Sequence, residues 1–280
     1  MLIETMIILT IIISLIYGFI KKVPLSLILI ILNIIIFIIT IFYRNLIEEF
    51  AFSPSYLRNS PKIYTIFTSL FIHGDFYHLI SNMIGLFFIG FPFENEIGQK
   101  KFFLVYILSG IFSSIAFSIF SSSNHYLIGA SGAIFGLLGS FAALYPTKKV
   151  VVPLPFMFVG MPVLLFAIIY ASIETIYTFA RITDGIAHSA HIGGFVVGVL
   201  SAPFLRRKFV FERSFDLNKL EELLQNERQR KIFERAKEAR EKEVRDAWIK
   251  YLIKEIKCPE CGGEIELDGE IKCKKCSYRK

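Results

Sequence analysis

Residues 102–147 read FFLVYILSGIFSSIAFSIFSSSNHYLIGASGAIFGLLGSFAALYPT, a run of 46 residues without Asp, Glu, Lys or Arg. A membrane-spanning helix needs about 20 mostly apolar residues, because the hydrocarbon core is roughly 30 Å thick and each residue rises about 1.5 Å. The run is therefore too long for one span. The polar residues Ser121 to His125 divide it, which predicts two membrane helices joined by a short turn.

Apolar stretches of similar length lie on both sides of this pair. Together they predict seven membrane helices, over about residues 3–20, 24–42, 77–93, 102–120, 130–146, 158–178 and 186–205. The composition agrees, since 54% of the residues are hydrophobic and the mean hydropathy is +0.56. An ordinary soluble protein is thereby excluded. The sequence predicts an all-α polytopic membrane protein.

The charged residues gather in the C-terminal quarter. Beginning with Arg206, this part holds 21 of the 31 Lys and Arg residues and 16 of the 24 Asp and Glu residues. A membrane domain followed by a water-exposed tail explains this distribution. Both signs of charge are mixed in the tail, so nucleic acid is not expected as a partner.

Basic residues alternate between the predicted loops, which predicts the orientation. One set of connections holds Lys21-Lys22, Lys100-Lys101, Lys148-Lys149 and Arg206-Arg207-Lys208, whereas the other holds Arg44, Arg58, Lys62 and Arg181. The positive-inside rule puts the first, denser set in the cytoplasm. We therefore expect a multi-pass protein of the cell membrane with its N-terminus outside and its tail cytoplasmic. Because Glu4 precedes the first apolar run and lysines follow it, an uncleaved anchor is favoured over a signal peptide.

The outer loop over residues 43–76 is unusually rich in large apolar side chains. They include Leu46, Phe50, Phe52, Tyr56, Leu57, Tyr64, Phe67, Leu70 and Phe71. Such a segment is expected to lie in the membrane interface with its apolar side down. An aromatic belt without a further role is the alternative.

Three groups of polar and small residues interrupt the apolar helices. His78 and Asn82 stand four residues apart, on one helix face. Residues 129–136 read GASGAIFG, and residues 190–198 read AHIGGFVVG. In the expected topology all three groups lie near the outer ends of their helices, where they can meet at one depth. Polar groups in a bilayer are costly and usually serve function or helix pairing.

Together these groups predict a nucleophile and its base. Ser131 needs a base within hydrogen-bond reach to become nucleophilic, and His191 can supply it. The small residues that accompany both would let two helices approach closely. Ser131 also opens a helix, where free N–H groups favour developing negative charge, and His78 and Asn82 can donate to the same oxyanion. Taken singly, Ser131 could be a packing residue, and His78 and Asn82 could be interhelical hydrogen-bonding partners.

A carboxylate partner for the base is not expected. Asp184 falls in a predicted loop, Glu174 is interpreted as lying deep on another helix, and His188 is expected to be structural. A Ser–His dyad is therefore favoured over a triad.

The HxxxN pair, the GASGAIFG run and the AHIGGxxxG run, in this order and spacing, resemble the rhomboid intramembrane serine proteases. The resemblance covers residues 24–205 and implies a six-helix core, preceded here by one extra transmembrane helix over residues 1–23. It implies that Ser131 is the nucleophile, that His191 is the general base, and that the Ser131 amide, His78 and Asn82 stabilise the oxyanion. It also implies an aromatic side chain stacked on the base, for which this sequence has Phe135 where Tyr is frequent.

The resemblance therefore predicts a serine endopeptidase that cleaves transmembrane segments of membrane-protein substrates near the outer face of the lipid bilayer. No cofactor is expected for catalysis. A non-catalytic rhomboid-like module that binds client transmembrane helices is the alternative, although loss of the serine or the histidine would be its signature. A transporter is disfavoured, since no inverted repeat is visible.

The tail divides into two predicted parts. Residues 206–257 are charged and helix-prone, which favours a solvated helix or helical hairpin. Residues 258–280 hold two CxxC pairs, Cys258 with Cys261 and Cys273 with Cys276, whose spacing is typical of a structural zinc ribbon. So small a segment cannot fold on apolar burial alone, so that Zn²⁺ is expected to stabilise it. A redox site is the weaker alternative. We expect the ribbon to serve binding of a cytoplasmic partner or regulation.

Overall fold

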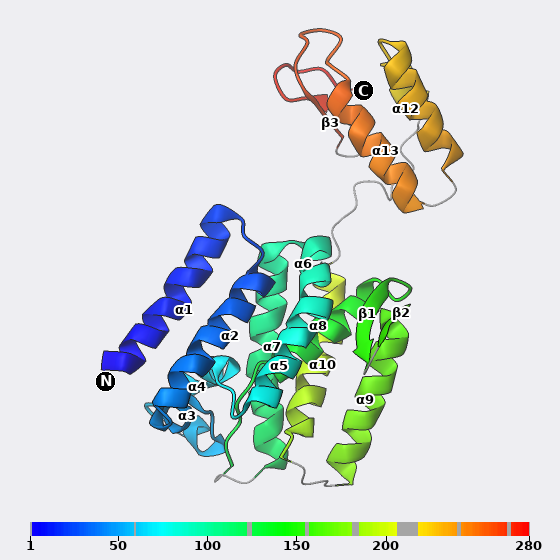
Figure 1. Cartoon of the computed structure of the whole chain (residues 1–280). Helices are drawn as coiled ribbons and strands as arrows, with labels where there is room; N and C mark the ends of the chain where they lie inside the picture. The colour runs from blue at the N-terminus through cyan, green and yellow to red at the C-terminus, as the bar shows by residue number, and fades with distance from the viewer. Residues whose placement is uncertain are drawn as a thin grey trace. The chain divides into compact units, whose positions relative to one another are not determined.

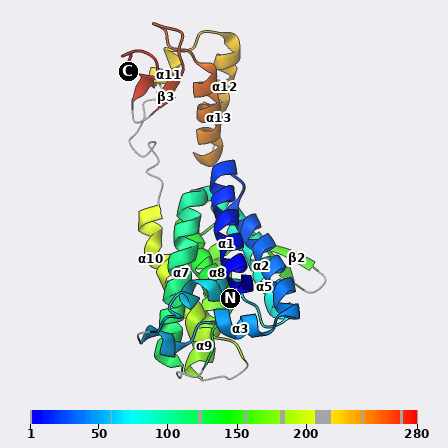
Figure 2. The same cartoon turned by 90° about the vertical axis from the view of Figure 1, so that its left-hand side faces the viewer.

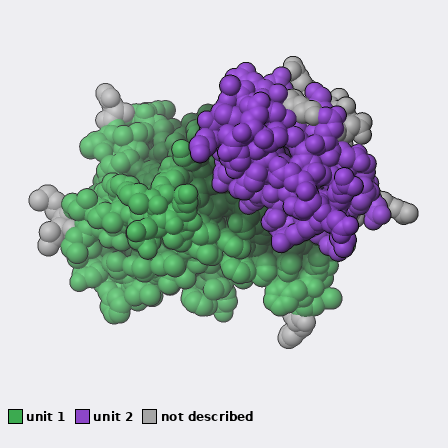
Figure 3. All heavy atoms as spheres, turned by 90° about the horizontal axis from the view of Figure 1, so that it is seen from above, with its two compact units in different colours: residues 1–206 green, residues 207–280 purple. Residues whose placement is uncertain are grey.

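The computed structural model describes residues 2–58, 60–121, 125–154, 157–180, 185–205, 218–239, 242–267 and 270–279. Several features predicted above lie outside these residues: positions 122–124 of the polar turn, Arg181, Asp184 and Arg206-Arg207-Lys208. The chain forms two compact units, Met1–Arg206 and Arg207–Lys280 (Figure 3). Each unit is described by itself.

The first unit is a helical bundle (Figures 1 and 2). Its long helices are α1 (Leu2–Lys21), α2 (Leu25–Phe42), α7 (Gln99–Phe120), α8 (Ser131–Leu144), α9 (Val163–Phe179) and α10 (His188–Leu205). Between α2 and α7 runs a composite helix made of α5 (Phe76–Gly85), the π-helical turn η3 (Leu86–Gly90) and α6 (Phe91–Ile97). The predicted all-α polytopic fold class is confirmed.

Five of these helices are long and apolar enough to cross a membrane: Ile3–Lys21, Leu25–Phe42, Phe76–Ile97, Gln99–Phe120 and His188–Leu205. The remaining two predicted spans, α8 and α9, are apolar but have 14 and 17 residues. Ten of the α8 residues are buried, which makes it the central helix of the bundle. Helices α7, α9 and α10 pack around it (Figure 1).

Residues 149–162 differ from the prediction, which started a helix at residue 158. They form an antiparallel hairpin of β1 (Lys149–Leu154) and β2 (Met157–Pro162), in register from Lys149 opposite Pro162 to Leu154 opposite Met157. Helix α9 begins only after Pro162. The β-branched run of Val150, Val151 and Val152 favours a strand, and proline fits a helix start but not the middle of a helix.

A buried carboxylate fixes the start of α2. Glu94 of α6 accepts hydrogen bonds from the backbone amides of Leu25 and Ser26, at 2.7 and 2.8 Å, and from the Ser26 hydroxyl at 2.6 Å. The first N–H groups of a helix have no acceptor within the helix. The Glu94 carboxylate accepts hydrogen bonds from two of them, and its negative charge interacts favourably with the positive end of the helix dipole. The extra helix α1 packs on α2 through Ile7, Ile11 and Leu15.

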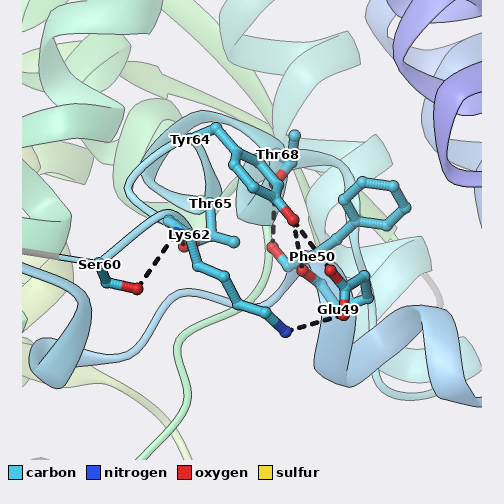
Figure 4. A network of polar contacts seen from close by, with 7 residues as sticks. All are labelled: Glu49, Phe50, Ser60, Lys62, Tyr64, Thr65 and Thr68. Carbon is cyan, nitrogen blue, oxygen red and sulfur yellow. Dashed lines mark hydrogen bonds and ion pairs between the residues drawn. The ribbon is translucent and has the colours of Figure 1, made fainter. Parts of the chain in front are cut away.

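The segment over residues 43–76 folds back on itself through α3 (Asn45–Phe50), η1 (Pro54–Leu57), α4 (Thr65–Thr68) and η2 (Ser69–Phe71). Figure 4 shows the polar contacts that join α3 to the residues before α4. Lys62 Nζ donates to Glu49 Oε2 at 2.8 Å, and the Tyr64 hydroxyl donates to Glu49 Oε1 at 3.0 Å. The hydrogen bond from Lys62 holds the pKa of Glu49 below its usual value.

The apolar side chains of this segment divide between core and surface. Leu46, Phe50 and Phe71 are buried in the main core of the unit, whereas Leu57 and Tyr64 are exposed. Only part of the segment is therefore available to a membrane interface.

The second unit contains α11 (Asn218–Glu221), α12 (Glu227–Glu238), α13 (Lys242–Glu255), β3 (Ile265–Leu267) and β4 (Ile271–Cys273). Helices α12 and α13 pack against each other as a hairpin, one of the two alternatives that the sequence left open. Phe233 of α12, Leu252 of α13 and Ile271 of β4 belong to one buried apolar cluster. The sequence predicts a boundary at residue 258 between the helical segment and the cysteine-bearing hairpin. In the structure the two parts share a single core.

Candidate active site

Ser131 is the first residue of α8, at the end of a turn that needs glycine. Gly129 has a φ of +103°, and a Cβ atom there would overlap the imidazole ring of His78. Only glycine suits both conditions, because it tolerates a positive φ and leaves room for the ring. The turn thus brings His78 of α5 against the backbone two residues before Ser131.

His191 faces Ser131 from the first turn of α10. Its Nε2 atom lies 2.8 Å from Ser131 Oγ, a hydrogen-bond distance. His191 is buried, with 7% of its surface exposed, whereas Ser131 is half-buried. An imidazole at this distance can accept the hydroxyl proton and so raise the nucleophilicity of the oxygen.

Glycines let α8 and α10 come close enough for this contact. A Cβ atom on Gly194 would overlap the carbonyl oxygen of Gly132, and one on Gly198 would overlap that of Gly136. Farther along the same contact, the Ser140 hydroxyl donates to the Gly198 carbonyl at 2.6 Å. The two helices therefore touch backbone to backbone, as small residues at a helix interface allow.

Phe135 lies one turn after Ser131 and covers the imidazole. The rings of Phe135 and His191 are stacked, with centroids 4.4 Å apart and planes inclined by 10°. An offset stack of this kind restricts the ring to one orientation. The Nε2 atom is thereby kept directed at Ser131.

The two residues predicted to stabilise an oxyanion are placed differently. His78 lies beside the turn that leads to Ser131, and its own backbone amide donates to Asp75 Oδ1 at 2.9 Å. The Asn82 side chain instead donates from Nδ2 to the His78 carbonyl oxygen at 2.7 Å, within its own helix. Among the described residues, no hydrogen bond joins either side chain to Ser131.

A carboxylate does approach the base, which corrects the interpretation of Glu174 as too deep. Glu174 lies in the last turn and a half of α9, at the same end of the bundle as the start of α10. Its Oε2 atom is 3.0 Å from His191 Nδ1 and 2.6 Å from His188 Nδ1. Since α9 runs directly into the loop before α10, the end of one helix and the start of the next share one depth. Counting residues back from that loop could have placed Glu174 at the depth of His191, but not in contact with it.

The four cysteines of the tail also converge. Their sulfur atoms lie within 4.8 Å of one another, with Cys258 to Cys276 at 3.6 Å and Cys261 to Cys273 at 3.4 Å. Sulfurs that share a tetrahedral zinc with bonds of about 2.3 Å lie roughly 3.8 Å apart, so the cluster fits such an ion. The Lys275 backbone amide, which donates to Cys273, lowers the pKa of that thiol to about 6.

Comparison with known proteins gives a consistent family. The sequence model of the Rhomboid domain matches residues 60–208, a little over half of the chain. The region includes every residue predicted for the Ser–His site.

Curated relatives point the same way. The chain is 31% identical to RHOMBOID-like protein 1 of Arabidopsis thaliana, over 54% of this chain and 36% of that protein. It is 33% identical to Rhomboid protein 1, mitochondrial, of Saccharomyces cerevisiae, over 49% of this chain and 40% of that protein. Identity to Rhomboid protease GluP of Bacillus subtilis is 33%, over 50% and 25% of the two chains. The chain thus spans well under half the length of these relatives.

Proposed function

Because the chain belongs to the rhomboid family, we propose that it is an intramembrane serine endopeptidase that cleaves transmembrane segments of membrane proteins near the outer face of the bilayer. One observation carries the proposal. Ser131 Oγ and His191 Nε2 lie 2.8 Å apart at the N-terminal ends of two tightly packed helices, α8 and α10. The protease name of one relative, GluP, supports the same activity.

The first half of the reaction acylates the serine. Ser131 Oγ attacks the carbonyl carbon of the scissile peptide bond, and its proton passes to His191 Nε2. The negative charge that forms on the carbonyl oxygen is stabilised by the N–H groups at the start of α8 and by donors on α5. His78 can donate from its position beside Gly129, whereas Asn82 must first release the His78 carbonyl.

The second half releases the product and restores the enzyme. The C–N bond breaks as His191 gives its proton to the departing amine. Water then attacks the acyl carbon while His191 accepts a proton from it, and collapse of the tetrahedral species returns that proton to Ser131 Oγ. A substrate helix must unwind locally, since its backbone has to present an extended carbonyl to the serine.

A cleavage assay in liposomes with a fluorescent transmembrane substrate tests the proposal. Ser131→Ala and His191→Ala are expected to lose activity, whereas Ser140→Ala, on the same helix but within the packing contact, is expected to keep most of it. A fluorophosphonate probe should label the wild type at Ser131. Binding of substrate helices without cleavage or labelling would instead indicate the non-catalytic module.

The topology forms part of the same proposal. The basic residues of the loops favour an outside N-terminus and a cytoplasmic tail in the cell membrane. Among the relatives, the yeast protein is named mitochondrial, so the identity of the membrane needs its own test. Cysteine-accessibility labelling at the exposed positions Ser55 and Ser277, combined with cell fractionation, distinguishes the two sides and the membranes.

For the tail, we propose a structural zinc ion held by Cys258, Cys261, Cys273 and Cys276. The four sulfurs are already gathered at distances that suit one tetrahedral ion. When bound, the ion would cross-link the loop around Cys258 to the hairpin β3–β4. Metal analysis of the purified protein is expected to find about one zinc per chain.

A further inference from the structure

Three buried polar side chains form a cluster behind the proposed base. Glu174, His188 and His191 have 8%, 6% and 7% of their surfaces exposed. Their ligating or titrating atoms all lie within 4.8 Å of one another. A buried carboxylate among apolar helices is costly unless it is paired, so its place here calls for a function.

The contacts run in one line from the serine. Ser131 Oγ lies 2.8 Å from His191 Nε2, and His191 Nδ1 lies 3.0 Å from Glu174 Oε2. The same Oε2 atom lies 2.6 Å from His188 Nδ1. Glu174 Oε2 therefore lies between the Nδ1 atoms of His188 and His191. Its contact with His188 is a hydrogen bond, whereas its contact with His191 is at ion-pair distance but is not aligned as a hydrogen bond.

We propose that Glu174 is a positioning residue for His191 and that His188 holds the Glu174 carboxylate in place. This inference rests on the proposed protease function. It extends the Ser131–His191 pair to a connected set of four side chains by adding Glu174 and His188. Glu174 acts through His191 and does not touch the substrate.

The chemistry follows from the two nitrogens of the imidazole. His191 can accept a proton at Nε2 only if its own proton is on Nδ1, and the negative charge of a carboxylate beside Nδ1 favours that tautomer. Once Nε2 takes the serine proton, the ring is a cation, and a carboxylate at 3.0 Å stabilises it. In a low-dielectric interior this attraction is stronger than in water.

A metal site made of the same three residues is the main competitor. Ligand atoms around a tetrahedral zinc with bonds of about 2.0–2.1 Å lie roughly 3.3 Å apart. The separation of 2.6 Å between Glu174 Oε2 and His188 Nδ1 is shorter and matches a hydrogen bond. The engagement of His191 Nε2 with Ser131 also agrees with a base that is free to take a proton.

The test compares two buried carboxylates in the full-length protein in liposomes. Glu174→Gln removes the charge beside His191, and Glu94→Gln removes the charge at the start of α2, in another part of the bundle. Turnover is expressed per folded molecule, and melting temperatures are measured for each variant. Glu174→Asp restores the carboxylate with a shorter side chain.

We expect Glu174→Gln to lower kcat by roughly a hundred- to ten-thousand-fold with little change in KM, as when the acid of a Ser-His-Asp triad becomes its amide. Glu174→Asp should recover at least tenfold over the glutamine variant. Glu94→Gln should lower the melting temperature while its folded fraction keeps a kcat near that of the wild type.

Four results would overturn the inference while leaving the protease function in place. The first two are a kcat of Glu174→Gln within threefold of the wild type, and a kcat of Glu174→Asp no higher than that of Glu174→Gln. The third is a loss of kcat in Glu94→Gln equal to that in Glu174→Gln. The fourth is a wild-type activity that is lost on chelation and restored by zinc in a Glu174-dependent manner, which would identify a metal site. An inactive wild type that no fluorophosphonate labels would instead overturn the proposed function itself.

Discussion

Gly194 of α10 lies so close to the carbonyl oxygen of Gly132 on α8 that a single methyl group would overlap that oxygen. The obstacle is backbone, which cannot rotate aside as a side chain can. The distance between the two helices at this level, and with it the contact of Ser131 with His191, therefore depends on the missing Cβ atom.

Gly194→Ala is accordingly expected to separate α8 from α10 and to lower both the melting temperature and kcat, the latter at least tenfold. Overpacking a tight interface typically costs about 1–3 kcal/mol. Gly160→Ala is the matched control, because a Cβ atom there meets no heavy atom within 4 Å. Wild-type kcat in Gly194→Ala would show that the close crossing does not set the serine–histidine distance.

Phe135 offers a test of the stacked ring. Phe135→Leu removes the aromatic face that covers His191 and is expected to lower kcat about two- to tenfold, since aromatic pairs contribute roughly 0.5–1.5 kcal/mol beyond area burial. Phe135→Tyr keeps the ring and should retain activity. The cleavage assay measures both variants side by side, and equal rates for leucine and tyrosine would argue against an orienting role.

The Glu49–Lys62 contact predicts a pH dependence of stability. The pKa of Glu49 is lowered in the folded protein by the hydrogen bond from Lys62, so the contact stabilises the fold above the unfolded pKa of the carboxyl. This contribution is lost as the pH falls through the lower, folded value. The pKa of Lys62 is raised by the same partner, so the contribution is also lost at strongly alkaline pH.

Melting curves of the wild type and of Lys62→Met measure this contribution. The difference in melting temperature should be present at neutral pH and shrink as the pH falls below about 4, the usual pKa range of a glutamate side chain. Because both side chains are about one-third exposed, we expect only about 0.5 kcal/mol. Lys100→Met, on α7, is the control, and a difference that persists unchanged at pH 3 would contradict the assignment.

Removal of metal from the tail is expected to loosen more than the cysteine loops. Because α12, α13 and the hairpin β3–β4 share one apolar cluster, loss of the cross-link should expose Phe233 and Leu252 together with the hairpin. Chelation, or Cys261→Ser with Cys273→Ser, should therefore increase protease sensitivity across residues 218–279. Ser277→Ala is the matched control, and a tail equally resistant with and without chelator would rule out a stabilising ion.

Sequence patterns predict the membrane helices well because each pattern is local. The predicted spans 3–20 and 24–42 correspond to α1 (Leu2–Lys21) and α2 (Leu25–Phe42). Length and apolar composition are sufficient for this, since a helix in lipid satisfies its own backbone. Residues 158–162, which the sequence predicts as the start of a helix, lie instead in β2, because a short apolar stretch suits a helix or a strand equally and Pro162 sets the helix start.

The sequence by itself determined the fold class, the family resemblance and the pairing of Ser131 with His191. The reason is that regularly spaced glycines and polar residues on one helix face indicate the surface through which that helix packs against another. Only the tertiary structure brought Glu174 to the other nitrogen of His191, at 3.0 Å, and joined the tail helices to the cysteine hairpin in one core. The reason is that the choice of neighbour, and the face that each helix turns toward it, depend on how whole helices pack against one another, which no local spacing specifies.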